Sequence, residues 1–436
     1  MSVVVSDACG WLLDSHSFIN EHYVCCLTKH GCSQQSAAYT FKREYFNIER
    51  PYIVSKPTEN GETGQSMHDL KTPSAVQKGK GRKRKRSLNQ GELDSEVYHD
   101  KIRLLVQEGT RSLVEMSQTL GYMIGVVASK ATETMTPPDC HLADMCDMAK
   151  SLHLDDGGAD DACPQSIWGD DDALDLFSRL TENPRDQSCE MTLMRGRYLI
   201  PPRCKFLLSD ITCTQPLRNS GETFDLIVLD PPWENKSVKR SSRYSFLPSS
   251  QLKQLPVDVL SSPECLVVTW VTNRPRHLRF VKEELYPHWG VQVLAEWLWV
   301  KVTRAGEFVF PLDSPHKKPY ELMVLGRKSY NSTSSNETVA TSDGSELSEC
   351  AVPLPDHRLV VSVPSALHSQ KPSLSDVWSC LHATYNQTGL AGEMKCSSFN
   401  ISATSPRTPL THINQTRKRH ISQCEYVFKT QFSFLL

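Results

Sequence analysis

The stretch that decides the fold is Phe224-Asp-Leu-Ile-Val-Leu-Asp-Pro-Pro-Trp233. Its residues 226–229 form a short continuous apolar run, which is typical of a strand buried on both faces of a parallel sheet. The two prolines cannot continue a central strand, so the chain should leave the sheet directly after Asp230. Ligands of open α/β sheets bind at the carboxyl ends of strands, where Asp230 would lie. An ordinary Asp-Pro turn is the alternative interpretation, but the whole tetrapeptide after a buried strand favours a site.

The residue types of this turn suit the methylation of an exocyclic amine. An aromatic amine such as that of adenine is a poor nucleophile, because its lone pair is delocalised into the ring. The Asp230 carboxylate and the Pro231 carbonyl offer acceptors for the two amine hydrogens, and proline fixes the φ angle that aims the carbonyl. Trp233 offers a face on which a base lifted out of a stack can rest. We therefore predict four catalytic residues, with S-adenosylmethionine as methyl donor: Asp230, Pro231, Pro232 and Trp233.

Four segments together resemble the MT-A70 family of adenine N(6)-methyltransferases: Asp230–Trp233, Trp270-Val-Thr-Asn273, Trp299-Val-Lys301 and His316-Lys-Lys-Pro-Tyr-Glu321. The resemblance is close from about residue 201 to residue 374 and looser upstream. It implies an α/β fold with a Rossmann-like methyltransferase sheet. It also implies methyl transfer to the N(6) amine of adenine in RNA or DNA.

The resemblance further implies donor-binding residues besides Asp230. Asp210 and Ile211, after an expected strand, would contact the adenine of the donor. Ser369 and Lys371 would meet its methionine carboxylate and ribose, and a lysine suits a carboxylate as a point charge. Without the resemblance, Asp210 would be interpreted as a turn residue and Lys371 as a surface residue.

A basic segment follows the Asp-Pro-Pro-Trp turn, and its positive charges beside an amine-methylating site favour contact with phosphates. A solvated loop is the alternative. In the family this segment is a mobile lid, with a base-contacting tyrosine at the place of Tyr244. A second basic patch lies at 316–318. The predicted substrate-binding residues are Asn235, Lys236, Lys239, Arg240, Arg243, Tyr244, His316 and Lys317.

The formal net charge of −2 over 436 residues points to no partner, but the distribution of charge is informative. Lys78–Arg86 is a dense basic block, which predicts a nuclear localisation signal or nucleic-acid tail rather than a solvated charge run. We expect a nuclear protein with RNA or DNA as partner, and the cytoplasm as a second location. The sequence contains no run of 18 apolar residues and no CxxC pair, so neither a membrane span nor a metal site is expected. The oligomeric state is left open.

Five parts are predicted along the chain: an N-terminal segment at 1–55, a disordered basic linker at 56–92, a helical N-terminal domain at 93–200, the methyltransferase domain at 201–375, and an atypical, disordered tail at 376–436. The helical domain is predicted from apolar residues at three- to four-residue steps over 98–120, and from a second candidate helix near 171–180. Strands alternating with helices from residue 201 onward indicate a mostly parallel sheet. They are expected at 206–208, 224–229, 265–271, 291–302, 320–325 and 359–363, with a helix over 278–285.

The tail lacks a feature that the fold requires. A methyltransferase of this fold needs a second half-site, usually a strand and a tight turn, for the amino-acid end of the donor. The family places that strand after the catalytic motif, but nothing like it occurs from Ser375 onward, and only Gly326 directly follows an apolar strand. A divergent strand within Cys424–Leu436 is the alternative. We therefore expect a sheet that is incomplete at its C-terminal end, and a catalytically silent protein that binds nucleic acid or a partner is the competing hypothesis.

Overall fold

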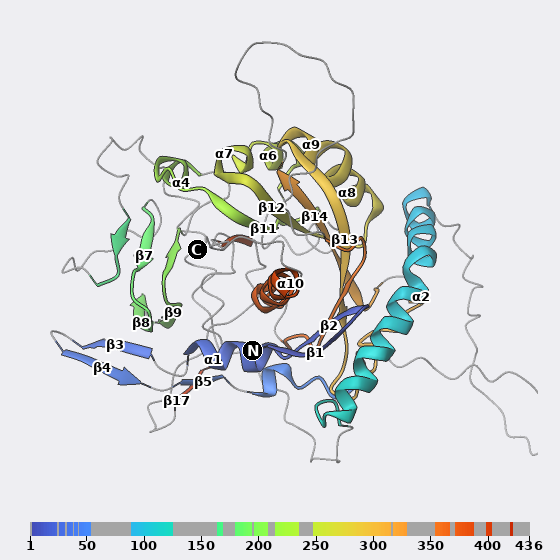
Figure 1. Ribbon diagram of the computed structural model, residues 1–436, viewed down its shortest axis with the longest axis horizontal. Coiled ribbons are helices and arrows are strands. Elements are labelled where there is room, and N and C mark those ends of the chain that lie inside the picture. Colours follow the sequence, from blue (N-terminus) through green and yellow to red (C-terminus); the bar gives the residue numbers. More distant parts are fainter. Residues whose placement is uncertain are drawn as a thin grey trace, which may run out of the picture.

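The computed structural model describes residues 2–23, 26–30, 33–37, 39–41, 43–53, 89–124, 164–168, 179–193, 196–207, 214–234, 247–314, 317–328, 354–366, 371–387, 398–402 and 419–421. They form an α/β structure around a mixed eight-stranded sheet (Figure 1). Its strands follow the order β1 (Val3–Asp7), β2 (Gly10–Leu13), β15 (Leu359–Ser362), β13 (Val291–Lys301), β14 (Tyr320–Lys328), β12 (Ser261–Val271), β11 (Phe224–Asp230) and β16 (Ser398–Ser402).

Six of these strands run in the same direction and end at the same edge of the sheet. β2, β15 and β13 are parallel to one another, as are β12, β11 and β16. β14 lies between the two groups and is antiparallel to both of its neighbours, which gives the groups a common direction. The edge where the six strands end is called the carboxyl edge below, and β14 begins there.

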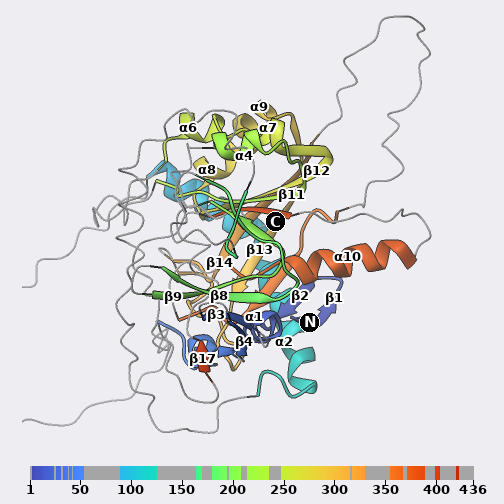
Figure 2. The same cartoon turned by 90° about the vertical axis from the view of Figure 1, so that its left-hand side faces the viewer.

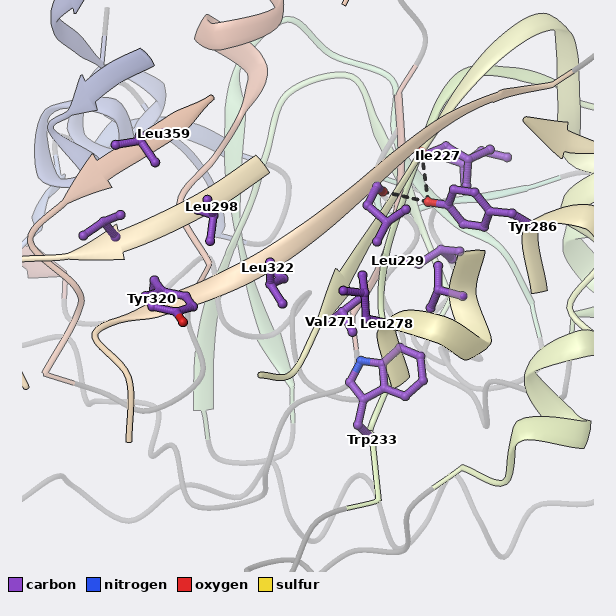
Figure 3. Close-up of a cluster of buried hydrophobic side chains, with 14 of the residues drawn as sticks. Ile227, Leu229, Trp233, Val271, Leu278, Tyr286, Leu298, Tyr320, Leu322 and Leu359 are labelled. Carbon is purple, nitrogen blue, oxygen red and sulfur yellow. Dashed lines mark hydrogen bonds between the residues drawn. The ribbon is translucent and has the colours of Figure 1, made fainter. Parts of the chain in front are cut away.

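The core covers both faces of the sheet because the central strands are apolar on both sides. On one face, Ile227 and Leu229 belong to a buried cluster with Leu278 and Tyr286 of the segment after β12 (Figure 3). That segment comprises α8 (Pro275–Arg279), a π-helical turn (Phe280–Leu285) and α9 (Tyr286–His288). On the other face, Trp297 stacks on Trp378 of α10 (Ser375–Gln387), with ring centroids 5.3 Å apart. The strands and the helical segment expected after residue 224 are confirmed.

The helix α2 (Gln90–Thr119) confirms the helical pattern expected from residue 94. It begins with a capping box, in which the Asn89 side chain accepts from the Glu92 amide and the Glu92 side chain accepts from the Asn89 amide. Its buried positions, including Ile102, Val106 and Leu113, join the core cluster of the face opposite α10. Figures 1 and 2 show α2 along the sheet, on the side away from α10.

A helical domain spanning 93–200 is not confirmed. The described residues after α2 form strands instead: β6 (Gln165–Ser166), β7 (Thr181–Asn183), β8 (Ser188–Leu193) and β9 (Gly196–Ile200). The stretch Ser188-Cys-Glu-Met-Thr-Leu193 alternates polar and apolar residues, which is the period of a strand and not of a helix. β7 pairs with β10 (Cys204–Phe206), and β8 pairs with β9 and with β3 (Cys26–His30). The second candidate helix falls mostly outside the described residues.

The ends of the chain also contribute to the main sheet. β1 and β2 extend it beyond β15, and α1 (Ser15–Tyr23) follows them directly. At the other end, β16 pairs in parallel with β11, from Leu226↔Ser398 to Asp230↔Ser402. The sheet expected to be incomplete at its C-terminal end is therefore not confirmed, nor is a tail without regular structure, because α10 and β16 lie within 375–402. β16 is short and rich in serine and asparagine, so its sequence carries little strand signal. The alternative strand in Cys424–Leu436 lies outside the described residues.

The remaining short elements complete the layers around the sheet: β4 (Ser33–Ala37), β5 (Tyr39–Phe41), the 3₁₀ turn η1 (Arg43–Phe46), α4 (Gln215–Asn219), α6 (Ser249–Lys253), α7 (Val257–Leu260) and β17 (Arg419–Ile421). Among the helices in the described ranges, none is long and apolar enough to cross a membrane.

Candidate active site

The Asp-Pro-Pro-Trp turn lies at the carboxyl edge, as predicted. Asp230 is the last residue of β11 and is 8 % exposed. The Leu247 amide donates to the Pro232 carbonyl at 3.1 Å. This bond brings Pro232 and Leu247, which flank the basic segment on either side, together near Asp230.

Lys371 joins β11 to the middle of the sheet. Its Nζ lies 3.2 Å from Asp230 Oδ2 and 3.1 Å from Glu321 Oε2. Glu321 is the second residue of β14 and also pairs with Lys301, the last residue of β13. The four side chains form a row of alternating charges, Asp230–Lys371–Glu321–Lys301, along the carboxyl edge.

Two tryptophans form an apolar floor under the two ammonium groups. Lys371 Nζ lies 5.5 Å from the ring centroid of Trp270, and Lys301 Nζ lies 4.4 Å from that of Trp299. The two indoles meet edge to face, with centroids 5.9 Å apart. A cation over an indole face is attracted by the ring quadrupole, and more strongly where water is excluded. The floor therefore helps to hold both ammonium groups in place.

Lys371 and Glu321 both stay ionised at neutral pH. Burial disfavours the charged form of Lys371, but Asp230 and Glu321 outweigh that effect and raise its pKa. Burial likewise disfavours the Glu321 carboxylate, yet Lys301 and Lys371 lower its pKa to about 2. The site thus presents an anionic acceptor whose orientation is set before any ligand binds.

Trp233 does not offer the open face that the sequence predicted. Its ring is 6 % exposed, its Nε1 donates to the Trp270 carbonyl at 2.8 Å, and it stacks on His277 with centroids 4.9 Å apart. Burial lowers the pKa of His277 to about 4, and Arg276 and Arg274 contribute to that shift. The neutral imidazole can therefore pack against the indole without burying a charge. In this structure Trp233 fixes the turn, and the face expected for a base is covered.

Of the other predicted residues, one is described, without a contact to Asp230, and ten lie outside the described ranges. Lys317 is exposed in the connection between β13 and β14, with its Nζ 5.3 Å from the Phe310 ring centroid. None of its described contacts involves Asp230. The ten outside the described ranges are Asp210, Ile211, Asn235, Lys236, Lys239, Arg240, Arg243, Tyr244, His316 and Ser369.

Sequence reasoning missed Glu321 and Lys301 as members of the site. Both stand in segments that carried the family resemblance, but no role was assigned to either. Trp299 and Glu321 are partners in the β13–β14 register, so a lysine at the end of one strand meets a glutamate at the start of the next. Opposite charges at these adjoining strand ends were the signal that could have identified the pair.

A small open cleft lies beside Lys371. Its space free of atoms, open solvent included, is about 300 Å³, and it is lined by Ser15, Phe18, Ile19, Phe46, Trp299, Val363, Pro364, Ser365, Lys371, Pro372 and Ser373. A buried cation at the wall of an otherwise apolar and hydroxyl-rich cleft suits a ligand that carries a carboxylate. Within the described part of the chain, no three histidine, cysteine or acidic side chains group as metal ligands.

Comparisons with known proteins identify the same region. Residues 224–388 match the MT-A70 family. The chain is similar to N(6)-adenine-specific methyltransferase METTL4 of Mus musculus, with 46% identity over 362 residues that cover 80% of this chain and 74% of that protein. It is 41% identical to METTL4 of Homo sapiens over 438 residues, covering 86% and 90% of the two chains. It is also 32% identical over 204 residues to N6-methyladenosine RNA methyltransferase MTA1 of Pyricularia oryzae, covering 44% and 50%.

Proposed function

The chain belongs to the MT-A70 family, and from this premise we propose that it transfers a methyl group from S-adenosylmethionine to the N(6) amine of adenine in nucleic acid. One observation carries the proposal: the Asp230 carboxylate is held at the carboxyl end of β11 by the ammonium of Lys371. The names of the relatives support the adenine amine as target, and that of MTA1 supports a nucleic-acid substrate. A catalytically silent protein is not favoured, because both METTL4 relatives are named as methyltransferases.

The chain's part in the reaction is to make a weak nucleophile reactive. Asp230 accepts one hydrogen of the amine, and the Pro231 carbonyl accepts the other. These two hydrogen bonds localise the nitrogen lone pair and direct it away from both acceptors. Lys371 restrains the carboxylate, so little reorganisation is needed when the transition state forms. After transfer the nitrogen carries an extra proton, for which Asp230 is the adjacent acceptor.

S-adenosylmethionine supplies a methyl group on a positively charged sulfur when it is bound. Asp230 provides a negative charge close to the place that this sulfonium must occupy, and Lys371 provides a positive charge for the methionine carboxylate. By family resemblance, Asp210 and Ile211 would contact the adenine of the donor and Ser369 its amino-acid or ribose groups. The geometry of these three contacts lies outside the described residues.

The nucleic acid would be held first by its phosphates. The basic segment between Pro232 and Leu247 carries four of the positive charges predicted for this role, at Lys236, Lys239, Arg240 and Arg243. Asn235 and Tyr244 of the same segment, and His316 and Lys317 of the second basic patch, complete the proposed substrate contacts. Both RNA and DNA fit this chemistry.

The direct test replaces Asp230 by asparagine. The amide keeps one acceptor oxygen but loses the charge, so methyl transfer to an adenine-containing oligonucleotide should fall roughly 10²- to 10³-fold. Asp225→Asn is the matched control, because Asp225 lies on the same strand at its opposite end, where it accepts from Ser262 Oγ at 2.6 Å. An Asp230→Asn enzyme as fast as the parent would contradict the proposal.

We further propose nuclear import through the basic block 78–86, which lies outside the described residues. Replacing Arg82–Arg86 by alanines should move a fluorescently tagged chain from the nucleus to the cytoplasm. Replacing Arg417-Lys-Arg419 in the same way serves as the control for general loss of positive charge. A nuclear signal unchanged by the first replacement would show that import depends on another segment or on a partner.

A further inference from the structure

A second cleft lies at the far end of the carboxyl edge, where β2 and β15 end. Its space free of atoms, open solvent included, is about 400 Å³. The residues that line it come from five separate parts of the chain: Leu13, Asp14, Ser15 and His16 after β2, Arg43 and Phe46 of η1, Tyr122 and Met123 after α2, Arg304 after β13, and Val363 after β15. This space is called the arginine cleft below.

The arginine cleft carries a surplus of positive charge. Arg43 and Arg304 both lie close enough to the Tyr122 hydroxyl for their charges to act on it. Asp14 is the one acidic residue among the described residues that line the cleft. Its carboxylate is already occupied by the Tyr122 hydroxyl and by donors at the start of α1: the His16 amide at 3.0 Å, the Ser17 amide at 3.1 Å and the Ser17 hydroxyl at 2.8 Å.

One of the two guanidinium groups is held in position by the neighbouring segment. Arg304 Nη1 donates to Asn47 Oδ1 at 3.2 Å, and its backbone amide donates to the Ile48 carbonyl at 2.8 Å. These bonds attach the connection after β13 to residues 47–48, just beyond η1 and its Arg43. A guanidinium restrained in this way loses less conformational entropy when it binds an anion.

The arginine cleft adjoins the cleft at Lys371. The two share Ser15, Phe46 and Val363 in their walls. Lys371 lines the second cleft and is paired with Asp230. The two clefts are therefore neighbours at the carboxyl edge, and Lys371 connects the second of them to Asp230.

We propose that the arginine cleft binds a phosphate group of the nucleic-acid substrate, at a nucleotide outside the one that is methylated. The inference rests on the proposed function and extends it. The planar fork of arginine matches phosphate geometry, and contacts of this kind set the position of a nucleic acid without reading its sequence. Arg43, His16 and Tyr122 lie outside residues 224–388, so the contact would add an N-terminal contribution to the family domain.

The test compares Arg43→Gln, Arg304→Gln and the double variant with the parent, using a fluorescein-labelled 12-nucleotide RNA with one adenosine and the unlabelled trinucleotide centred on it. Arg111→Gln is the control, because it removes one positive charge from an exposed position on α2. The double variant should bind the 12-mer roughly tenfold or more weakly. Its slope of log K against log salt should flatten by about 0.7 for each lost phosphate contact.

Three control measurements on the double variant complete the expected result. Methylation of the trinucleotide, donor binding by calorimetry and the melting temperature should match those of the parent. Unchanged 12-mer affinity and slope in the double variant would overturn the inference, and so would an equal effect of Arg111→Gln. A parallel loss of donor binding would overturn it too, because it would assign the cleft to the donor.

Two further outcomes distinguish this inference from binding of a small anion and from failure of the proposed function. Inorganic phosphate could raise the melting temperature of the parent but not of the double variant, while both bind the 12-mer equally well. The cleft would then bind a small anion, and the inference would be wrong. If the parent methylates neither RNA nor the matching DNA and binds neither, the proposed function fails and the inference fails with it. Methylation by the parent with unaltered double-variant binding overturns the inference alone.

Discussion

At the scale of single residues, Lys371 organises the site more than any other side chain. Its side chain is 14 % exposed and faces two carboxylates, one on β11 and one on β14. Removing one partner of a buried charged group leaves the others uncompensated, and this costs more than an exposed pair is worth. Lys371 should therefore matter for stability as well as for the orientation of Asp230.

Lys371→Met should lower the free energy of unfolding at pH 7 and weaken its dependence on acid. The pKa of Glu321 is depressed to about 2, so the stability it contributes is present above its ordinary pKa near 4.5 and is lost as pH falls toward 2. Without Lys371 that depression is smaller, although Lys301 maintains part of it. The free energy of unfolding in urea should therefore differ less between pH 7 and pH 3.5 for the variant than for the parent.

Lys253→Met is the control for this prediction. Lys253 pairs with Glu284 at 2.9 Å, but both side chains are more exposed than Lys371, and such pairs contribute roughly 0–1 kcal/mol. The control should keep the parent's difference between the two pH values. If Lys371→Met keeps the parent's difference in unfolding free energy between pH 7 and pH 3.5, Lys371 does not lower the pKa of Glu321 as described.

At the scale of elements, the sequence predicted the strands with long apolar runs and missed the short ones. β11, β12, β13 and β14 are central and buried, so apolar residues alone reveal them. β16 has only five residues, and its pairing with β11 joins positions more than 160 residues apart, which no local pattern encodes. The turn at Asp230 could be predicted from the residues next to it in the sequence. The packing of His277 over Trp233 could not, because His277 lies in a separate helix, α8.

Gly326 shows how an element can be misinterpreted from sequence. Because the apolar run ends at residue 325, the sequence predicts Gly326 to lie beyond the end of that strand. In the structure it lies inside β14, between Val267 of β12 and Val293 of β13. Its role is close packing: a Cβ there would lie 2.7 Å from the Gln292 carbonyl oxygen and 2.7 Å from the Tyr286 ring.

Gly326→Ala should therefore destabilise the fold. Tyr286 cannot move easily, because its buried hydroxyl bonds to the Val267 carbonyl, the Thr269 hydroxyl and the Val324 carbonyl. Overpacking of this kind costs about 1–3 kcal/mol. Gly91→Ala in α2 is the control, since a Cβ there meets nothing closer than 3.5 Å. Denaturant unfolding that shows no loss for Gly326→Ala would contradict this packing.

At the scale of the whole molecule, the main sheet is assembled from both ends of the sequence. Residues 3–13 supply one border and residues 398–402 the other, so the family segment 224–388 does not contain the complete sheet. The order of strands places β11, with Asp230, between β12 and β16. β11 is consequently an interior strand, and its backbone groups on the outer side depend on a segment that the sequence alone did not identify.

The last prediction tests that dependence with two shortened chains, one ending at Cys396 and one at Ser405. The longer keeps β16 and the shorter removes it. Without β16, β11 becomes an edge strand whose outward amides lose their partners. Hydrogen exchange at 226–230 should then be roughly tenfold faster or more in the shorter chain, because local opening exposes those amides. Methyl transfer should fall with it, since Asp230 ends that strand. The longer chain is the control and should match the parent. Equal protection of 226–230 in the two shortened chains would show that β16 does not hold the catalytic strand.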